Sequence, residues 1–303
     1  MSTPPASTAR QLDPASVQAW LRRQAHAPEA PWLHAEVARR MADRLSFIRV
    51  QPQVVLDWWA FGGGSTELLL KAYPQARHLA VEPTEALQAH GEQKRATPWW
   101  SPRRWRGTTV ETVAPEAVAP ASVQLLWANM MLHAVVDPAR LVAQWQRLLA
   151  ADGFVMFSCL GPGSLRALNE IYARMGWGAP LADFVDMHDL GDMLVQAGFA
   201  DPVMDQEVLT LSWDSAEALL KELRTLGANA SPQRYAGLRT PRWRQRLLAE
   251  LESLARPDGR IYLDFEIAYG HAFKAAPRAP LAAETRVSVD DMRAMVRTRP
   301  PKA

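Results

Sequence analysis

Acidic side chains stand at the ends of two apolar segments, where they could hold a nucleotide-like ligand. Asp57 comes near the end of the segment that begins at residue 54, and Glu82 ends the next one. An acid in the second position can accept hydrogen bonds from the two ribose hydroxyls of such a ligand. Because Glu82 precedes Pro83, the alternative is an ordinary acidic residue in a strand-to-helix turn.

Two further polar groups follow apolar strands. Asn129 and His133 come after the third strand, "VQLLWANMML", although a lone histidine is more often a surface or core residue. The glycine-proline-glycine turn at 161–163 precedes a helix that opens at Ser164. A helix start after such a turn can hold an anion, and the alternative is simply a tight turn.

These residues must be positioned by a sheet. Apolar runs at 54–59, 78–83, 123–132 and 154–160 alternate with helical patterns at 65–74, 137–153 and 187–198. This alternation predicts an α/β fold with parallel strands covered on both faces. Ligands then bind at the carboxyl ends of the strands, where the polar residues above should gather.

Composition excludes several classes. The 303 residues have a net charge of only +2, so a general nucleic-acid binder is not favoured. The single cysteine, Cys159, rules out an internal disulfide and a multi-cysteine metal site, and no metal is expected. Without an apolar leader or an 18-residue apolar stretch, we expect a soluble cytoplasmic protein with no membrane span.

Two basic segments could contact a partner. Residues 97–107, "TPWWSPRRWRG", interleave tryptophan with arginine, which suits single-stranded nucleic acid, an acidic protein, or a crossover loop packed on the sheet. The amphipathic helix predicted at 240–254 carries Arg242, Arg244 and Arg246 in its first turns. Early arginines oppose the helix dipole, a weak hint of a partner.

The order of these pieces resembles the class I S-adenosylmethionine-dependent methyltransferases. Within them it is similar to the malonyl-[acyl-carrier protein] O-methyltransferase family of biotin synthesis, over roughly residues 35–274. The resemblance is carried by "MADRLSFIRVQPQVVLD", "WANMML", "FSCLGPGSLRAL", "DFVDMHDLGDMLVQAGFADPVMD", "LLKELRTLGANAS" and "DFEIAYGHAFK". The fourth and fifth segments contain the blocks most specific to this family.

The resemblance implies a Rossmann-like seven-stranded sheet whose last two strands form an antiparallel pair. It also implies a single domain over 13–276, with helical lid insertions at about 161–187 and 213–258. We expect a disordered tail at 1–12 and a loosely attached tail at 277–303.

The implied reaction is S-adenosylmethionine-dependent methylation of the free carboxylate of a malonyl thioester, on acyl-carrier protein or on CoA. A carboxylate is already nucleophilic, so the protein mainly has to align it and hold its charge. Lys221 and Arg224 are the candidates for that role, and His133 is a further catalytic candidate. An acidic carrier protein would also suit the two basic segments.

The first loop departs from the family pattern, which resembles D-x-G-x-G-x-G. The same register here places Trp59 and Phe61 at two of the three glycine positions and Gly63 at the third. A shifted register would use Gly62, Gly63 and Gly64 instead. Glycines matter in this loop because they let the backbone approach the ligand closely.

Two more family residues are replaced. Thr108 stands where the family has an acid for the adenine amino group, and Pro28 and Glu29 stand where it has a tyrosine. We still expect an active enzyme, but these replacements leave two alternatives open. One is a non-catalytic relative that acts as a binding protein, and the other is a methyltransferase of RNA or another substrate. The cofactor residues predicted from sequence are Asp57, Gly62, Gly63, Glu82, Pro83, Thr108 and Asn129.

Overall fold

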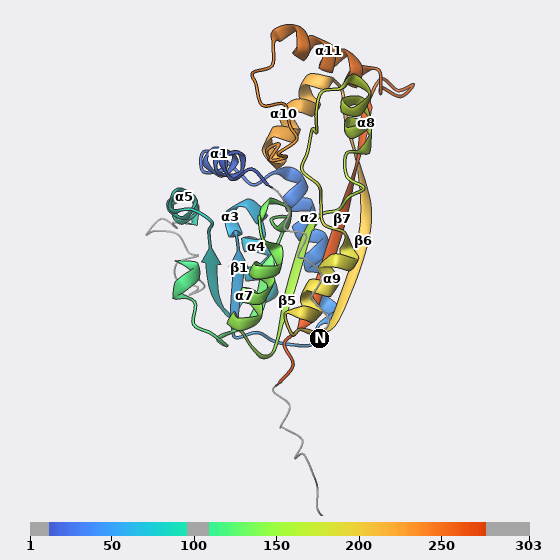
Figure 1. Ribbon diagram of the computed structural model, residues 1–303. Coiled ribbons are helices and arrows are strands. Elements are labelled where there is room, and N and C mark those ends of the chain that lie inside the picture. The colour runs from blue at the N-terminus through green and yellow to red at the C-terminus, as the bar shows by residue number, and fades with distance from the viewer. Residues whose placement is uncertain (1–11, 96–108, 277–303) are drawn as a thin grey trace, which may run out of the picture.

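The computed structural model describes residues 12–95 and 109–276 (Figure 1). Two helices begin this part of the chain, α1 at Pro14–Gln24 and α2 at Trp32–Arg44, with a 3-10 turn, η1, at Leu45–Phe47. Helix α1 begins as predicted, because the Asp13 side chain accepts a hydrogen bond from the Ala15 N–H at 3.2 Å and proline occupies the first position.

A seven-stranded sheet forms the centre of the described structure, in the order β3-β2-β1-β4-β5-β7-β6. Strands β1 to β5 run parallel, and β7 pairs antiparallel with both β5 and β6, which confirms the predicted Rossmann-like sheet. The strands are β1 Val54–Trp58, β2 Arg77–Val81, β3 Val110–Val113, β4 Val123–Ala128, β5 Leu149–Leu160, β6 Ala200–Trp213 and β7 Ile261–Phe273.

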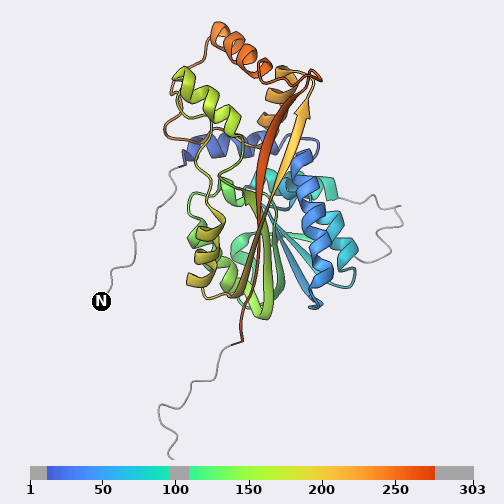
Figure 2. The ribbon, with the colours of Figure 1, turned by 90° about the vertical axis from the view of Figure 1, so that its right-hand side faces the viewer.

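Helices cover both faces of the sheet (Figure 2). Helix α2 and α4 (Thr66–Ala72) lie on one face, where Leu33, Val37 and Met41 are fully buried at the predicted spacing. Helices α7 (Pro138–Leu148) and α9 (Met187–Gln196) lie on the other face. Trp145 of α7 is buried in the hydrophobic cluster between these helices and the sheet. This arrangement leaves the carboxyl edge of the parallel strands available for a site.

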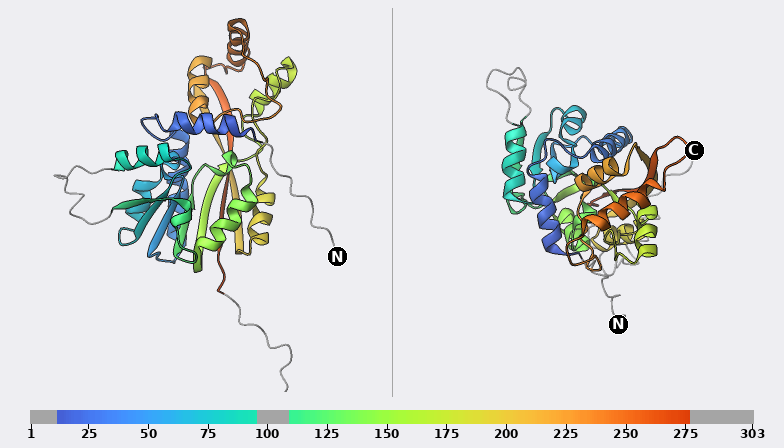
Figure 3. Two further views of the ribbon diagram at one scale, coloured as in Figure 1. Left: turned by 60° about the vertical axis from the view of Figure 1, so that its left-hand side comes forward. Right: turned by 90° about the horizontal axis from the view of Figure 1, so that it is seen from above.

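Strands β6 and β7 extend past the rest of the sheet and carry a helical layer at their far end (Figure 1). This layer contains α8 (Arg166–Met175), α10 (Ala216–Leu226) and α11 (Pro241–Glu252), all within the segments predicted as lid insertions. Helix α1 lies across the carboxyl edge below it (Figure 3). Gln24 Nε2 donates to the Thr225 carbonyl at 2.6 Å, which joins α1 to the end of α10.

Several boundaries differ from the prediction, and two of these differences have a clear local cause. The helix predicted over 137–153 ends at Leu148, because β5 begins at Leu149 and bends through Asp152, which has a positive φ of 61°. Strand β4 stops at Ala128 rather than 132, since Met130 turns to φ 51° and donates its N–H to the Ser158 carbonyl at 3.0 Å. The turns η2 (Pro115–Ala117) and η3 (Leu132–Ala134) complete this half.

The remaining elements are short helices beside the carboxyl edge, α3 at Ala60–Gly63 and α5 at Glu85–Arg95. No helix within residues 12–95 and 109–276 is long and apolar enough to cross a membrane.

Candidate functional site

The loop after β1 does not form an open glycine turn; it folds into α3. Trp59 has φ 60°, a left-handed conformation that glycine adopts more easily, and it donates its N–H to the Val81 carbonyl at 2.7 Å. Two residues further on, the backbone N–H of Phe61 donates to Glu82 Oε1 at 2.9 Å. Glu82 is therefore at the predicted edge, buried, and already bonded to the chain's own backbone.

The other acid at this edge, Asp57, is also buried, and Thr66 Oγ1 donates to its Oδ2 at 3.4 Å. The displaced glycines differ in what they pack against. A Cβ at Gly63 would lie 3.4 Å from the Asn129 carbonyl, whereas one at Gly62 would meet nothing within 4 Å. Gly64, with φ 66°, is the glycine whose backbone conformation side chains disfavour.

Asn129 ties three elements together. Its Nδ2 donates to the carbonyls of His34 at 2.8 Å and Gly63 at 2.6 Å, and its Oδ1 accepts from Ser158 Oγ at 2.6 Å. Both amide hydrogens are thus used within the protein. The structure places Asn129 at the predicted edge but gives it a bracing role between α2, α3 and β5.

His34, which sequence analysis missed, lies behind α3 and is fully buried. Its Nδ1 lies 2.8 Å from the Gly62 carbonyl, so Nδ1 carries the proton, because a carbonyl oxygen only accepts. Burial lowers the pKa of His34 from 6.5 to about 4, against the opposing effect of that hydrogen bond. His34 fits the apolar helical stripe of Leu33 and Val37, so only its residue type could have signalled a polar role.

Aromatic rings cover the carboxyl ends of β1 and β2. Trp59 lies against Trp20 of α1, with ring centroids 6.3 Å apart, and Phe61 meets His90 of α5 edge-on at 4.6 Å. Together with Leu87 they belong to one hydrophobic cluster beneath α1. Helix α1 is thereby packed directly onto the loop that departs from the glycine pattern.

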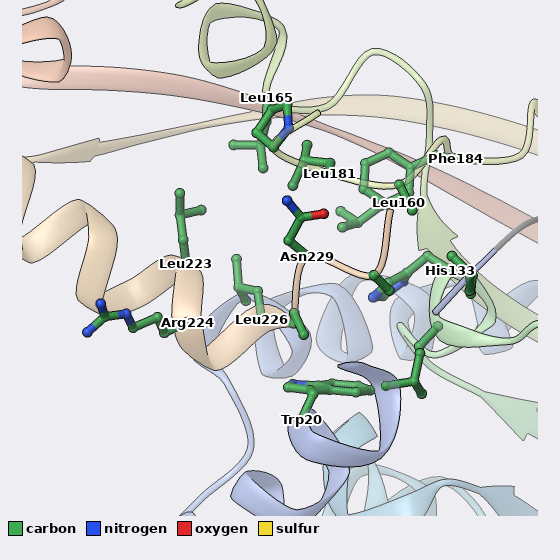
Figure 4. Close-up of a pocket in the computed structure, with 18 of the residues that line it drawn as sticks. Trp20, His133, Leu160, Leu165, Leu181, Phe184, Leu223, Arg224, Leu226 and Asn229 are labelled. Atoms are coloured by element: carbon green, nitrogen blue, oxygen red, sulfur yellow. The ribbon is translucent and has the colours of Figure 1, made fainter. Parts of the chain in front are cut away.

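A cavity of about 320 Å³ lies on the other side of Trp20, between α1, α10 and the segment after β5 (Figure 4). His133 and Arg224 both line it, so two of the predicted catalytic residues share one cavity. In Figure 4, His133 and Arg224 lie on opposite sides of the cavity, and the Arg224 guanidinium points away from the other labelled side chains. Lys221, the third predicted residue, is exposed and is not among the lining residues.

Arg23, in the last turn of α1, also lines this cavity and was missed from the sequence. The sequence does show a basic residue near the end of a predicted helix. The neighbouring residues, however, do not indicate which other element this helix will face. His133 itself lies edge-on to Phe184, with centroids 6.1 Å apart, and 6.3 Å from the His34 ring.

The glycine-proline-glycine turn is occupied by an anion from within the chain. The Gly163 N–H donates to Glu266 Oε1 at 3.2 Å, and Ser164 Oγ donates to the Glu266 carbonyl at 3.0 Å. The carboxylate lies where a Cβ at Gly161 or Gly163 would stand. Of the two alternatives left open for this turn, it thus holds an anion, and that anion is a side chain of β7. The helix predicted to open at Ser164 begins at Arg166, because Leu165 has a positive φ of 57°.

The other predicted residues lie away from this cavity or outside the described part of the chain. Pro83 follows Glu82 in the turn to α5, while Thr108 and the basic segment 97–107 lie outside the described residues. The second basic segment is the amphipathic helix α11, as predicted, with Arg242, Arg244 and Arg246 exposed.

Comparison with known proteins agrees with the fold. A family model described as a methyltransferase domain matches residues 59–157. A putative methyltransferase from Bacillus halodurans has a similar structure, with a TM-score of 0.53 and 16% identity over 78% of this chain and 100% of that one. The matched segment and this similar structure define the fold of the chain as that of a methyltransferase.

Curated relatives narrow the class. The malonyl-[acyl-carrier protein] O-methyltransferase of Gallionella capsiferriformans is 35% identical over 251 residues, which are 81% of this chain and 85% of the relative. The one from Nitrosospira multiformis is 35% identical over 271 residues, or 85% and 88%. The chain belongs to the malonyl-[acyl-carrier protein] O-methyltransferase family.

The carboxyl edge does not fit S-adenosylmethionine in the arrangement described here. Trp59 and Phe61 stand where the family pattern has glycines, and Trp20 closes over them from α1. Glu82 and Asn129 have the right chemistry, yet both already bond the chain's own backbone. Entry of the methyl donor therefore requires the aromatic side chains, or α1 above them, to move.

Proposed function

We propose that the chain methylates the free carboxylate of a malonyl group carried as a thioester by acyl-carrier protein. The names of its relatives support this substrate, whereas they give no support to malonyl-CoA. The product is a methyl ester without the negative charge, suited to further chain extension in biotin precursor synthesis. A cytoplasmic location is part of this proposal.

The observation that carries the proposal is the cavity shared by His133 and Arg224. A carboxylate needs no general base before it attacks a methyl group, so the protein must bind, orient and shield it. Arg224 is the cation that suits this task, because a guanidinium pairs with both carboxylate oxygens at once. Its side chain is exposed in the last turn of α10 and lines the cavity.

His133 has a different role in the proposal. Its side chain lines the cavity from η3, where it lies edge-on to Phe184. A ring nitrogen there can donate a hydrogen bond that orients the carboxylate or the thioester carbonyl. Lys221 lies outside the cavity, so we assign it no contact with the substrate.

Methyl transfer from isotope-labelled S-adenosylmethionine to purified malonyl-acyl-carrier protein tests the proposal. Arg224→Ala should lose most of the rate, chiefly through a higher KM for the carrier substrate, while Lys221→Ala should retain it. Malonyl-CoA in place of the carrier substrate should be a poor acceptor. Absence of transfer by the parent chain, with the carrier shown to be loaded, would refute the proposed function.

A further inference from the structure

The cavity between α1 and α10 is more apolar than a malonyl group requires. Its walls include Leu160, Leu165, Leu181, Leu226 and Phe184. A malonyl group is short and ends in a charge, and burying a carboxylate among such side chains without a cation is unfavourable. A charged end therefore belongs beside the cations that line the cavity, and the apolar part of the walls can take a hydrocarbon.

The polar group in the middle of the cavity is already satisfied. Asn229 Nδ2 donates to the Ala179 carbonyl at 2.7 Å, and its Oδ1 accepts from the Ser231 N–H at 3.1 Å. These bonds hold the segment after α10 in place. Both the nitrogen and the oxygen of the Asn229 amide are thus bonded to the protein itself.

Two cations stand where α1 and α10 end. Arg23 is in the last turn of α1 and Arg224 in the last turn of α10, and both are exposed while lining the cavity. The bond from Gln24 to Thr225 joins the two helices at this place. An apolar interior with a basic mouth matches a ligand with a hydrocarbon chain and an anionic or polar head.

We infer that this cavity binds the aliphatic chain of a medium-chain acyl group, as the carboxylate or the thioester, with its head at Arg23 and Arg224. This goes beyond the proposed methylation, because the ligand is longer than malonyl and binding needs no methyl donor. The volume of about 320 Å³ lies at the lower end of the range for ligand pockets, about 300–1,000 Å³.

Calorimetric titration of the full chain with octanoic acid, decanoic acid and decanol, all without methyl donor, tests the chain-length dependence. Each added methylene should strengthen binding about fourfold, so decanoic acid should bind more than tenfold tighter than octanoic acid. Decanoyl-acyl-carrier protein, compared with the unloaded carrier, tests the thioester form. No saturable binding, affinity independent of chain length, or tighter binding of pantetheine than of decanoic acid would each overturn the inference.

Filling the cavity should block the ligand. Ala182 lines the cavity from the segment between α8 and α9, so Ala182→Trp places a large ring inside it. Affinity for decanoic acid and decanol should fall more than tenfold. Ala173→Trp, on the exposed surface of α8, is the matched control, and thermal unfolding verifies that both variants fold. Unchanged affinity in folded Ala182→Trp would show that the ligand binds elsewhere.

The role of Arg23 and Arg224 in holding the head group of the ligand is tested separately. The double change Arg23→Gln and Arg224→Gln should weaken decanoic acid about tenfold and leave decanol unaffected, because only the acid carries a charge. Arg22→Gln, an exposed residue of α1 outside the cavity lining, should change neither. Equal weakening of acid and alcohol would remove the arginines from the head-group role. Since these titrations contain no methyl donor, their failure is distinguishable from failure of malonyl methylation.

Discussion

The carboxylate of Glu82 accepts a hydrogen bond from the backbone N–H of Phe61 at 2.9 Å, and this bond joins the end of β2 to α3. The acid at this position is the one the sequence assigns to the ribose of the methyl donor. One of its oxygens is instead used to hold the loop that blocks the crevice. Our prediction that Glu82 also holds the ribose makes the position of this loop and the binding of the donor interdependent.

Removing this carboxylate should weaken the donor complex. Glu82→Ala should lower the affinity for S-adenosylhomocysteine in calorimetry at least tenfold, since each lost hydrogen bond costs about 1 to 1.5 kcal/mol. Glu85→Ala, an exposed acid in the first turn of α5, should leave the affinity unchanged. Equal affinities for Glu82→Ala and the parent chain would show that the ribose is held elsewhere.

Opening the loop should have the opposite effect. Trp59→Gly removes the ring that packs on Trp20 and relieves a left-handed conformation that costs a side-chain residue about 1 kcal/mol. We expect tighter binding of S-adenosylhomocysteine. Trp32→Ala, which removes a tryptophan that is 58% exposed on α2, serves as the control. Weaker binding in Trp59→Gly would mean that the indole helps to form the donor site.

His34 should make stability depend on pH. Because its pKa falls from 6.5 to about 4 on folding, the unfolded chain takes up a proton first. The contribution of neutral His34 to the free energy of unfolding is complete above pH 6.5 and is lost as the pH falls through 4. This contribution amounts to about 3 kcal/mol. Urea unfolding of His34→Gln between these pH values should show a shallower fall than the parent chain. An identical slope would exclude His34 as the titrating group.

The glycine turn after β5 should tolerate a side chain only if Glu266 gives way. Gly163→Ala places a Cβ against the Glu266 carboxylate and should cost about 1–3 kcal/mol of unfolding free energy. In a Glu266→Ala background the same change should cost much less. Gly227→Ala, which meets nothing within 4 Å, is the control. Additive losses in the double variant would separate the turn from Glu266.

Much of the fold could be predicted because it depends on neighbours along the chain. The alternation of apolar runs with helices predicted the sheet, and Asp13-Pro14 predicted the start of α1. Glu82 and Asn129 lie at the expected edge, since parallel strands align their carboxyl ends. The departure at Trp59 and Phe61 was also visible in the sequence alone.

The partner of each polar atom could not be predicted from local pattern. Glu82 bonds a backbone group 21 positions away, and Asn129 bonds carbonyls 66 and 95 positions away. For the glycine turn the sequence left an anion site and a simple tight turn open, and the group that it holds is a carboxylate 103 positions further on. Such pairs are chosen by how helices and strands pack, so residue types and spacing leave them open.

By itself, then, the sequence determined the fold class, the family and the edge at which the chemistry belongs. Tertiary structure decided that α1 lies across that edge, that Arg23 and Arg224 line one cavity, and that Lys221 does not line it. Lys221 and Arg224 are neighbours on one helix and look equivalent in sequence. Only the packing of α10 against α1 gives their side chains different surroundings.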